Sequence, residues 1–152
     1  NHKPSHHRKK YAFESVDPLY VFGHGLSYSN FVYSDLKIAQ DGSTKDAVIK
    51  LSANLSNESE FDGEEVVQVY FRDEYSAITR PVKELVAYQR VFVESGQSIP
   101  VEFSIPLEAL SYFDADMKIV VEAGDFTFMV GGSSADDNLI KASHLVKSDF
   151  IY

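Results

Sequence analysis

The stretch AVIKLSANLS, residues 47–56, alternates apolar and polar side chains. Successive side chains of an extended chain point to opposite faces, so Ile49, Leu51, Ala53 and Leu55 share one face and the polar residues occupy the other. This period of two predicts a β-strand with one face in an apolar core and the other in solvent.

Apolar runs of similar length recur on both sides of this stretch. Residues 101–105 alternate in the same way, whereas residues 65–72 carry β-branched or aromatic side chains on both faces. Apolar groups on both faces indicate a central strand, packed against the core on one side and covered by a neighbour on the other. The predicted strands are residues 31–39, 47–56, 65–72, 82–93, 101–105, 117–122, 125–130 and 139–146.

Turn signals separate these runs. Asp41-Gly42 and Ser95-Gly96 are typical of turns. Pro106 can open a single helical turn up to Leu110, because proline is tolerated at a first helical position. Ala123-Gly124 predicts a hairpin between the two strands that flank it, and residues 82–93 are expected to bend near Ala87.

Seven or eight short strands at intervals of about 8 to 12 residues, with almost no helix, indicate an all-β fold of the antiparallel β-sandwich type. We place this sandwich in residues 31–152. Residues 1–17 show no sustained period, and Pro4 and Pro18 discourage a continuous helix, so this part is predicted to be an extended connection.

The composition limits the classes of function. A length of 152 residues with 44% hydrophobic content allows one ordinary core. All 23 acidic residues lie beyond residue 10 and the formal net charge is −9, which argues against nucleic acid as a partner. No apolar run reaches the roughly 18 to 20 residues of a membrane span. The absence of cysteine excludes disulfides and thiol catalysis.

The densest cluster of aromatic residues and glycine is PLYVFGHGLSY, residues 18–28. Three aromatics and two glycines in eleven residues suit neither a helix nor a regular strand, so we expect a tightly packed, irregular crossing. Because the sequence begins at Asn1 rather than Met, we also expect it to be a piece of a longer polypeptide.

Four motifs carry a family resemblance. PLYVFGHGLSYSNFVYSDL, residues 18–36, resembles the linker that leads into the C-terminal fibronectin type III-like domain of glycoside hydrolase family 3 enzymes, which include β-glucosidases and β-xylosidases. EVVQVY (residues 65–70), TRPVKEL (79–85) and GDFTFMVGGSS (124–134) are similar to further motifs of that family, in the same order. Val21 departs from the family, which usually has proline there.

The resemblance implies an immunoglobulin or fibronectin type III-like sandwich preceded by an extended linker. Residues 1–5 resemble the end of the family's preceding α/β domain, so residues 1–30 would comprise the linker and the edge of that domain. The family's nucleophilic aspartate lies in an N-terminal barrel, and its acid/base glutamate lies in that barrel or in the α/β domain. No catalytic residue therefore carries over to this chain.

The resemblance also implies partners and a location. The upstream barrel and α/β domains would be the partners of this domain, and the whole enzyme would bind an oligosaccharide without a cofactor. The location would be periplasmic or extracellular. Its work would be to stabilise the catalytic domains and to shape the rim of the sugar pocket.

Two kinds of site residue follow. Tyr75 lies in the long connection of residues 73–81, where an exposed aromatic ring can stack on a sugar or pack onto a neighbouring domain. Aromatic residues, close-approaching glycines and a planar guanidinium suit a contact between domains. The residues expected to pack there are Tyr20, Phe22, Gly23, Gly25, Leu26, Tyr28, Arg80, Pro81, Lys83 and Glu84.

Other candidate sites have simpler explanations. Neighbouring acids are expected to be solvated surface charges rather than a catalytic pair, and the histidines near the N-terminus lie in a connector that lacks the ligands of a closed metal site. Residues 131–134 lack the lysine and helix of a phosphate-binding loop and indicate a hairpin exit. The residues concerned are Glu64, Glu65, Asp73, Glu74, Asp114, Asp116, His2, His6 and His7.

Three hypotheses of function remain at this point. The first is a non-catalytic C-terminal domain of a family 3 glycosidase. The second is an independent carbohydrate-binding module, against which the absence of tryptophan argues, because such platforms usually expose several aromatic rings. The third is an adhesion-type fibronectin repeat, against which the lack of a tandem copy argues.

Overall fold

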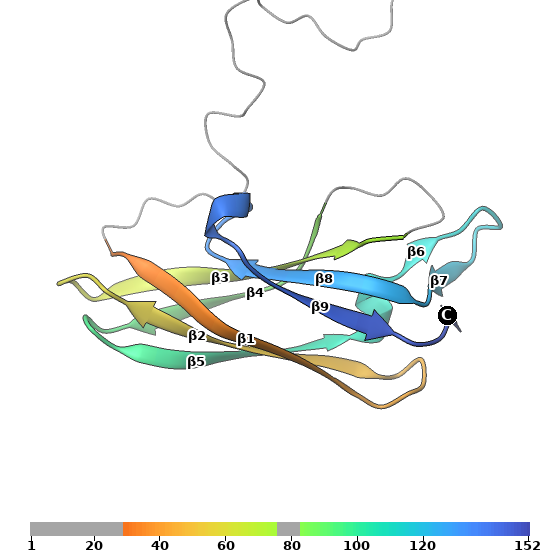
Figure 1. Cartoon of the computed structure of the whole chain (residues 1–152), viewed down its shortest axis with the longest axis horizontal. Helices are drawn as coiled ribbons and strands as arrows, with labels where there is room; N and C mark the ends of the chain where they lie inside the picture. Colours follow the sequence, from red (N-terminus) through yellow and green to blue (C-terminus); the bar gives the residue numbers. More distant parts are fainter. Residues whose placement is uncertain (1–28, 76–82) are drawn as a thin grey trace, which may run out of the picture.

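Two antiparallel β-sheets pack face to face, and a third, small sheet lies at one end (Figure 1). The structure is a computed structural model that describes residues 29–75 and 83–152. The elements of these residues are β1 (Phe31–Asp41), β2 (Val48–Asn57), β3 (Gly63–Asp73), β4 (Glu84–Val93), β5 (Ser98–Pro106), the 3-10 turn η1 (Leu107–Leu110), β6 (Tyr112–Phe113), β7 (Ile119–Val121), β8 (Gly124–Gly131), η2 (Asp136–Asn138), β9 (Ile140–Val146) and β10 (Phe150–Ile151).

Strand β2 lies in the middle of the first sheet, between β1 and β5. Its four alternating apolar residues are buried, which confirms the pattern of residues 47–56. Three of them pair with buried residues of β5: Ile49 opposes Ile105, Leu51 opposes Phe103, and Ala53 opposes Val101. Because apolar residues of β2 lie opposite apolar residues of β5 on the same face, this face of the sheet forms one half of the core.

A bulge in β1 keeps that strand's apolar residues on the core side. The register shifts between Ser34 and Lys37, so Tyr33 faces the core before the bulge and Leu36 faces it afterwards. Asp35 adopts a φ of 54°, in the left-handed region that aspartate tolerates better than most residues. Its carboxylate accepts a hydrogen bond from Asn54 Nδ2 at 3.0 Å, across the sheet.

The second sheet has the strand order β4-β3-β8-β9, so β3 is central, as predicted. Val67, Val69 and Phe71 of β3 point into the core. The Phe71 ring lies 6.3 Å from the ring of Phe126 and 6.4 Å from that of Phe128, measured between centroids. These aromatic contacts join the two central strands of the sheet on its inner face.

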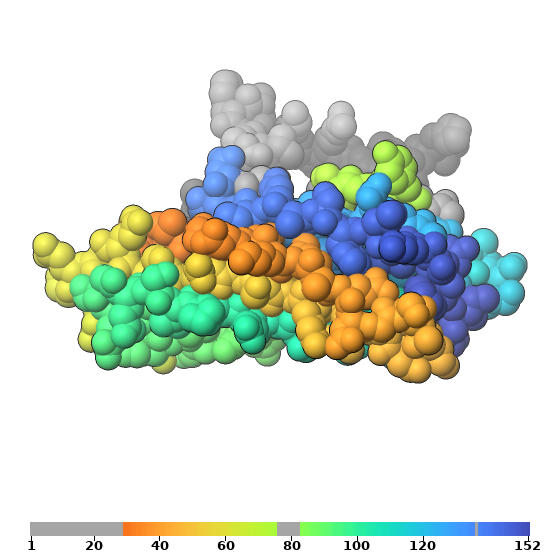
Figure 2. Space-filling model, turned by 60° about the horizontal axis from the view of Figure 1, so that its bottom comes forward, coloured from red at the N-terminus to blue at the C-terminus, as the bar shows by residue number. Residues whose placement is uncertain are grey.

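The two sheets meet at their open edges. Figure 2 shows β9 (blue) lying alongside β1 (orange) on the face formed by β1, β2 and β5. His144 of β9 and Gln40 of β1 are joined there by a hydrogen bond of 3.0 Å between Nε2 and Oε1. Burial lowers the pKa of His144, which favours its neutral form in this contact.

The predicted hairpin around Ala123-Gly124 is wrong. Strand β7 pairs with β6 and β10 in the third sheet, whereas β8 pairs with β3 and β9. Two apolar runs separated by a glycine resemble a hairpin locally, but Phe126 and Phe128 of β8 pack beside Phe71 of β3. The backbone N–H of Ala123 instead donates to Asp149 Oδ1 at 2.7 Å, at the crossing between sheets.

Several smaller predictions are confirmed. The register of β4 shifts next to Ala87, where a bend was expected, and residues 107–110 form one 3-10 turn after Pro106. The last predicted strand, at residues 139–146, corresponds to β9, which pairs antiparallel with β8. Residues 131–134 therefore lead from β8 towards β9 and are not the exit of a hairpin around Ala123-Gly124. Of the predicted linker, residues 1–28 lie outside the described residues. Within residues 29–75 and 83–152, no helix is long and apolar enough to cross a membrane.

Truncating the core of β2 tests this packing. The variant Leu55→Ala, at a side chain with no exposed surface, should lower the free energy of unfolding by about 2 to 5 kcal/mol, because it removes apolar contacts and leaves a cavity. Urea denaturation followed by circular dichroism measures the change. The neighbouring variant Ser56→Ala, on the outer face, should cost less than about 1 kcal/mol. Equal losses for the two variants would contradict the assignment of faces.

Candidate functional site

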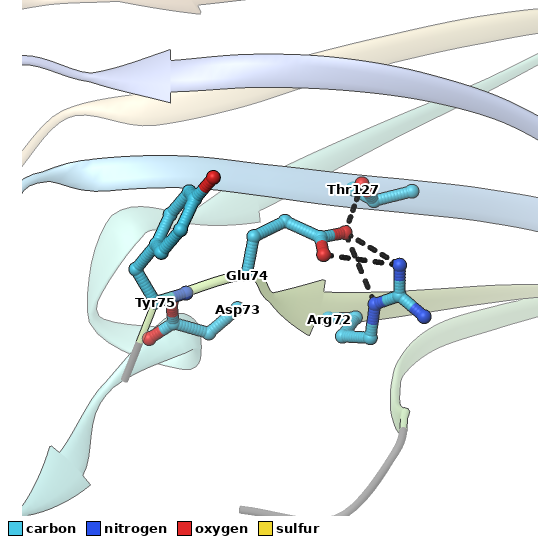
Figure 3. Close-up of polar contacts among 5 residues, drawn as sticks. All are labelled: Arg72, Asp73, Glu74, Tyr75 and Thr127. Carbon is cyan, nitrogen blue, oxygen red and sulfur yellow. Dashed lines mark hydrogen bonds and ion pairs between the residues drawn. The ribbon is translucent and has the colours of Figure 1, made fainter. Parts of the chain in front are cut away.

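At the end of β3, immediately before Tyr75, Arg72 and Thr127 bind the carboxylate of Glu74, and we call these three residues the carboxylate clamp. The Arg72 guanidinium donates to both carboxylate oxygens of Glu74, at distances between 2.8 and 3.0 Å (Figure 3). Thr127 of β8 donates its hydroxyl to Oε1 of the same carboxylate at 2.5 Å. Arg72 and Thr127 are paired across β3 and β8, so the sheet register sets the spacing of the two donors.

This clamp holds Glu74 in its ionised form. The hydrogen bond from Thr127 lowers the pKa of the Glu74 carboxyl, and the hydrogen bonds and charge of Arg72 lower it further. A general acid at neutral pH needs the opposite shift. The arrangement therefore suits a structural contact between β3 and β8 rather than acid catalysis.

Tyr75 follows the clamp and is 79% exposed. Its backbone N–H donates to Asp73 Oδ1 at 3.0 Å, a local turn that sets the direction in which the chain leaves β3. An exposed aromatic ring whose backbone is held in this way can stack on a sugar ring or on a flat protein surface.

Lys83 lies at the other end of the same connection. Its ammonium group donates to the backbone carbonyl of Ser134 at 2.5 Å, and β4 begins one residue later, at Glu84. The half-buried Lys83 side chain thus contacts the segment between β8 and β9. Two polar contacts therefore lie on either side of residues 76–82. Glu74 is bound by Thr127 of β8, and Lys83 is bound to Ser134, which follows β8.

A half-buried polar pair joins the two sheets elsewhere. Tyr33 of β1 donates its hydroxyl to Glu65 Oε1 of β3 at 2.8 Å. Burial raises the pKa of both groups, and the charge of Glu65 raises that of Tyr33 further. Gly132 lies against the Glu65 carboxylate, so a side chain at position 132 would require this carboxylate to move. This pair acts as a cross-link between sheets.

The remaining sequence candidates do not assemble into a site among the described residues. Glu64 pairs with Arg90, on the face opposite to Glu65, as predicted from the alternation. Asp114 caps its own turn by accepting from the backbone N–H groups of Asp116 and Lys118. No group of three or more metal-ligating side chains occurs in residues 29–75 and 83–152. The predicted site residues Tyr20, Phe22, Gly23, Gly25, Leu26, Tyr28, Arg80 and Pro81 lie outside the described residues.

Two exposed aromatic residues of β4 were missed from the sequence. Tyr88 is 71% exposed and Phe92 is 56% exposed. Both lie on the outer face of the second sheet. They pair with Gln68 and Glu64, which alternate along β3 with the core residue Val67 and so point away from the core. The sequence spacing could have identified them. Tyr88 and Phe92 are four residues apart, so they share one face of the strand, opposite to the face of Val91 and Val93.

The comparisons with known proteins agree with this fold. Residues 65–134 match the family described as fibronectin type III-like domain. The chain is 40% identical over 134 residues to a putative β-xylosidase of Formosa agariphila, covering 88% of this chain and 18% of that protein. This is a fibronectin type III-like domain of the family 3 glycoside hydrolases.

Other relatives of the fibronectin type III-like domain are β-glucosidases. A periplasmic β-glucosidase of Salmonella typhimurium is 33% identical, with 88% of this chain and 17% of that protein covered. The solved structure of β-glucosidase 3B from Thermotoga neapolitana in complex with α-D-glucose superposes with a TM-score of 0.81 at 34% identity, covering 90% of this chain and 18% of that one. The chain thus spans less than a fifth of the length of these relatives and matches their C-terminal region.

The clamp at the end of β3 predicts a pH dependence. Since the pKa of Glu74 is lower in the folded than in the unfolded state, its carboxylate stabilises the fold at neutral pH, and this contribution is lost as the pH falls through the folded pKa. Glu74→Gln should lower the unfolding free energy by about 1 kcal/mol at pH 7, and the difference from wild type should shrink towards pH 3.

Urea denaturation at pH 3, 5 and 7 measures this dependence. Glu102→Gln, at an exposed carboxylate on the outer face of β5, is the matched control and should change the unfolding free energy at pH 7 by less than about 0.5 kcal/mol. A Glu74→Gln effect that is the same at all three pH values would show that ionisation of the clamp does not matter.

Proposed function

We propose that this chain is a non-catalytic domain of a larger family 3 glycoside hydrolase, an exo-acting enzyme that removes terminal β-linked sugars from oligosaccharides. The observation that carries the proposal is the pattern of coverage. Relatives whose names are β-xylosidase or β-glucosidase match most of this chain, yet they are about five times as long. The chemistry would then belong to the part of the enzyme outside this match.

The polar groups of the domain support a structural role. Glu74 is held ionised by Arg72 and Thr127, and Glu65 is enclosed by Tyr33 and Gly132. A retaining glycosidase requires two carboxyl groups about 5 to 5.5 Å apart on either side of the scissile bond, with their pKa values shifted in opposite directions. Carboxylates committed to contacts inside the sandwich are poorly suited to that task.

The contacts with the other domains would involve two segments. One is the stretch that contains Tyr20, Phe22, Leu26 and Tyr28, in which Gly23 and Gly25 would allow close approach of backbones. The other is the connection from Tyr75 to Glu84, with Arg80, Pro81 and Lys83. The domains of the chain would accordingly be a linker with the edge of an α/β domain at residues 1–30 and the sandwich at residues 31–152.

The relatives also suggest where the enzyme works. One of them is described as a periplasmic β-glucosidase. A cysteine-free chain with an acidic net charge is compatible with a periplasmic or extracellular location, which we propose for the whole enzyme.

Activity measurements on two proteins test the proposal. The whole polypeptide that contains this domain should hydrolyse an aryl β-glucoside or an aryl β-xyloside, and the 152-residue chain alone should not hydrolyse either. With nitrophenyl glycosides as the aryl substrates, the absorbance of the released nitrophenol measures both activities. Clear turnover by the purified 152-residue chain would refute a non-catalytic role.

A substitution tests whether Tyr75 lies at the rim of the sugar pocket. In the whole enzyme, Tyr75→Ala should raise KM for a disaccharide about 5- to 30-fold and leave kcat nearly unchanged, as expected when about 1 to 2 kcal/mol of stacking is lost equally from the bound substrate and the transition state. Tyr75→Phe keeps the ring and should behave like wild type. Unchanged KM for Tyr75→Ala would leave packing against a neighbouring domain as the role of this ring.

A further inference from the structure

We propose that the outer face of strands β3 and β4 is the surface by which this domain docks onto the other domains of the same enzyme. The inference rests on the proposed function, because it takes the catalytic part of a family 3 enzyme as the partner. It adds the orientation of the domain: which of the two sheets is turned towards that partner, and which residues make the contact.

The outer face is apolar where a solvent-exposed face would be polar. The register pairs Glu64 with Phe92, Val66 with Arg90, Gln68 with Tyr88 and Tyr70 with Leu85, and all of these point away from the core residues Val67 and Val69. Tyr88 and Phe92 are 71% and 56% exposed, and Val66 and Leu85 are 37% and 39% exposed. They continue into the buried side chains of Tyr70 and Met129, which form a small cluster of their own.

The first sheet shows what a solvated outer face looks like in this protein. The outward residues of β2 are Lys50, Ser52, Asn54 and Ser56, and those of β5 opposite them are Ser104, Glu102, Pro100 and Ser98. Seven of these eight residues are polar or charged. The outer face of β3 and β4 is therefore more apolar than the outer face of β2 and β5, and of these two faces only the first has the composition of a buried interface.

Four of the polar side chains on the apolar face already have partners. Gln68 Nε2 donates to the carbonyl of Gly132 at 2.7 Å, and Tyr70 donates its hydroxyl to Gln68 Oε1. Arg90 pairs with Glu64 at 3.3 Å. Removing water from this face would leave these groups hydrogen-bonded, so the desolvation cost is lower than for unpaired polar groups. Tyrosine and arginine are also enriched among the residues that dominate protein interfaces.

The size of the face fits a contact between domains. Ten residues of strand at about 3.3 Å each, and two strands about 4.8 Å apart, give roughly 300 Å² on this domain, or roughly 600 Å² when the surfaces of both partners are counted. That is at the lower end of the roughly 600 to 1,500 Å² buried between domains of one chain. A second copy of this domain fits less well, because each copy carries a formal net charge of −9 and two such copies repel each other.

A sugar polymer is the alternative occupant, since two aromatic rings on one strand could stack on sugar rings. Such a platform needs free donors and acceptors beside the rings for the sugar hydroxyls. Here the groups beside Tyr88 and Phe92 are Gln68, Arg90 and Glu64, which make the hydrogen bonds given above, together with the aliphatic Val66 and Leu85. The observations therefore favour a protein surface.

Cysteine labelling in the whole polypeptide tests the proposal. The chain has no cysteine of its own, so Tyr88→Cys, Phe92→Cys and Val66→Cys each introduce one probe on the face. Alkylation by iodoacetamide is followed by mass spectrometry of the peptide that carries the probe. Each rate is divided by its rate in the denatured protein. Phe113→Cys, at a residue 57% exposed on β6, and Ser104→Cys, on the outer face of β5, are the matched controls.

We expect labelling at the three face positions to be at least tenfold slower than at the two controls. Val66→Cys changes the side-chain volume little, so it keeps the test valid if loss of an aromatic ring prevents folding. Equal rates at face and control positions would overturn the proposal. So would protection that appears only after adding cello- or xylo-oligosaccharides, or only at high protein concentration, which would assign the face to a sugar or to a second copy. Labelling does not depend on hydrolysis, so an inactive enzyme with a protected face would refute the proposed function alone.

Discussion

Strand β3 has apolar side chains on both of its faces, and the rest of the domain is arranged around this constraint. Its inner residues Val67, Val69 and Phe71 are covered by the first sheet, which supplies the alternating residues of β2 and β5. Its outer residues are only partly covered: Tyr70 is buried, while Val66 remains more than one third exposed. A strand with this composition is stable only when both faces are shielded from water.

The ends of β3 are secured by polar contacts in addition to apolar packing. At one end, the paired residues Arg72 and Thr127 hold Glu74 and set the start of the connection that contains Tyr75. At the other end, Tyr33 reaches across to Glu65, and Gly132 allows the close approach of that carboxylate. These contacts fix β3 relative to β1 and β8, so the outer face of β3 and β4 is a preformed surface. A preformed surface loses less conformational entropy on docking than a mobile one.

The sequence predicted features that depend on residues close together in the chain, such as strands and their buried faces. It did not predict features that depend on distant residues, such as which strands pair. The alternation of residues 47–56 and 101–105 identified two strands and their buried faces, because that pattern is local. The hairpin at Ala123-Gly124 was wrong because the choice of pairing partner for β7 and β8 is made across the sheets. The clamp could not be predicted either, since Arg72 and Thr127 are brought together only by the register of β3 and β8. The motifs of residues 65–134 nevertheless identified the fibronectin type III-like domain.

The central claim is that this domain turns its second sheet towards the catalytic part of a family 3 glycosidase. An experimental structure of the whole polypeptide, by crystallography or electron cryo-microscopy, measures this directly through the exposed fractions of Tyr88 and Phe92. The account predicts that both fall from 71% and 56% to near zero, against side chains of another domain, while the outer residues of β2 and β5 stay in solvent. Tyr88 and Phe92 that remain in solvent, with another face of the sandwich in the interface, would contradict it.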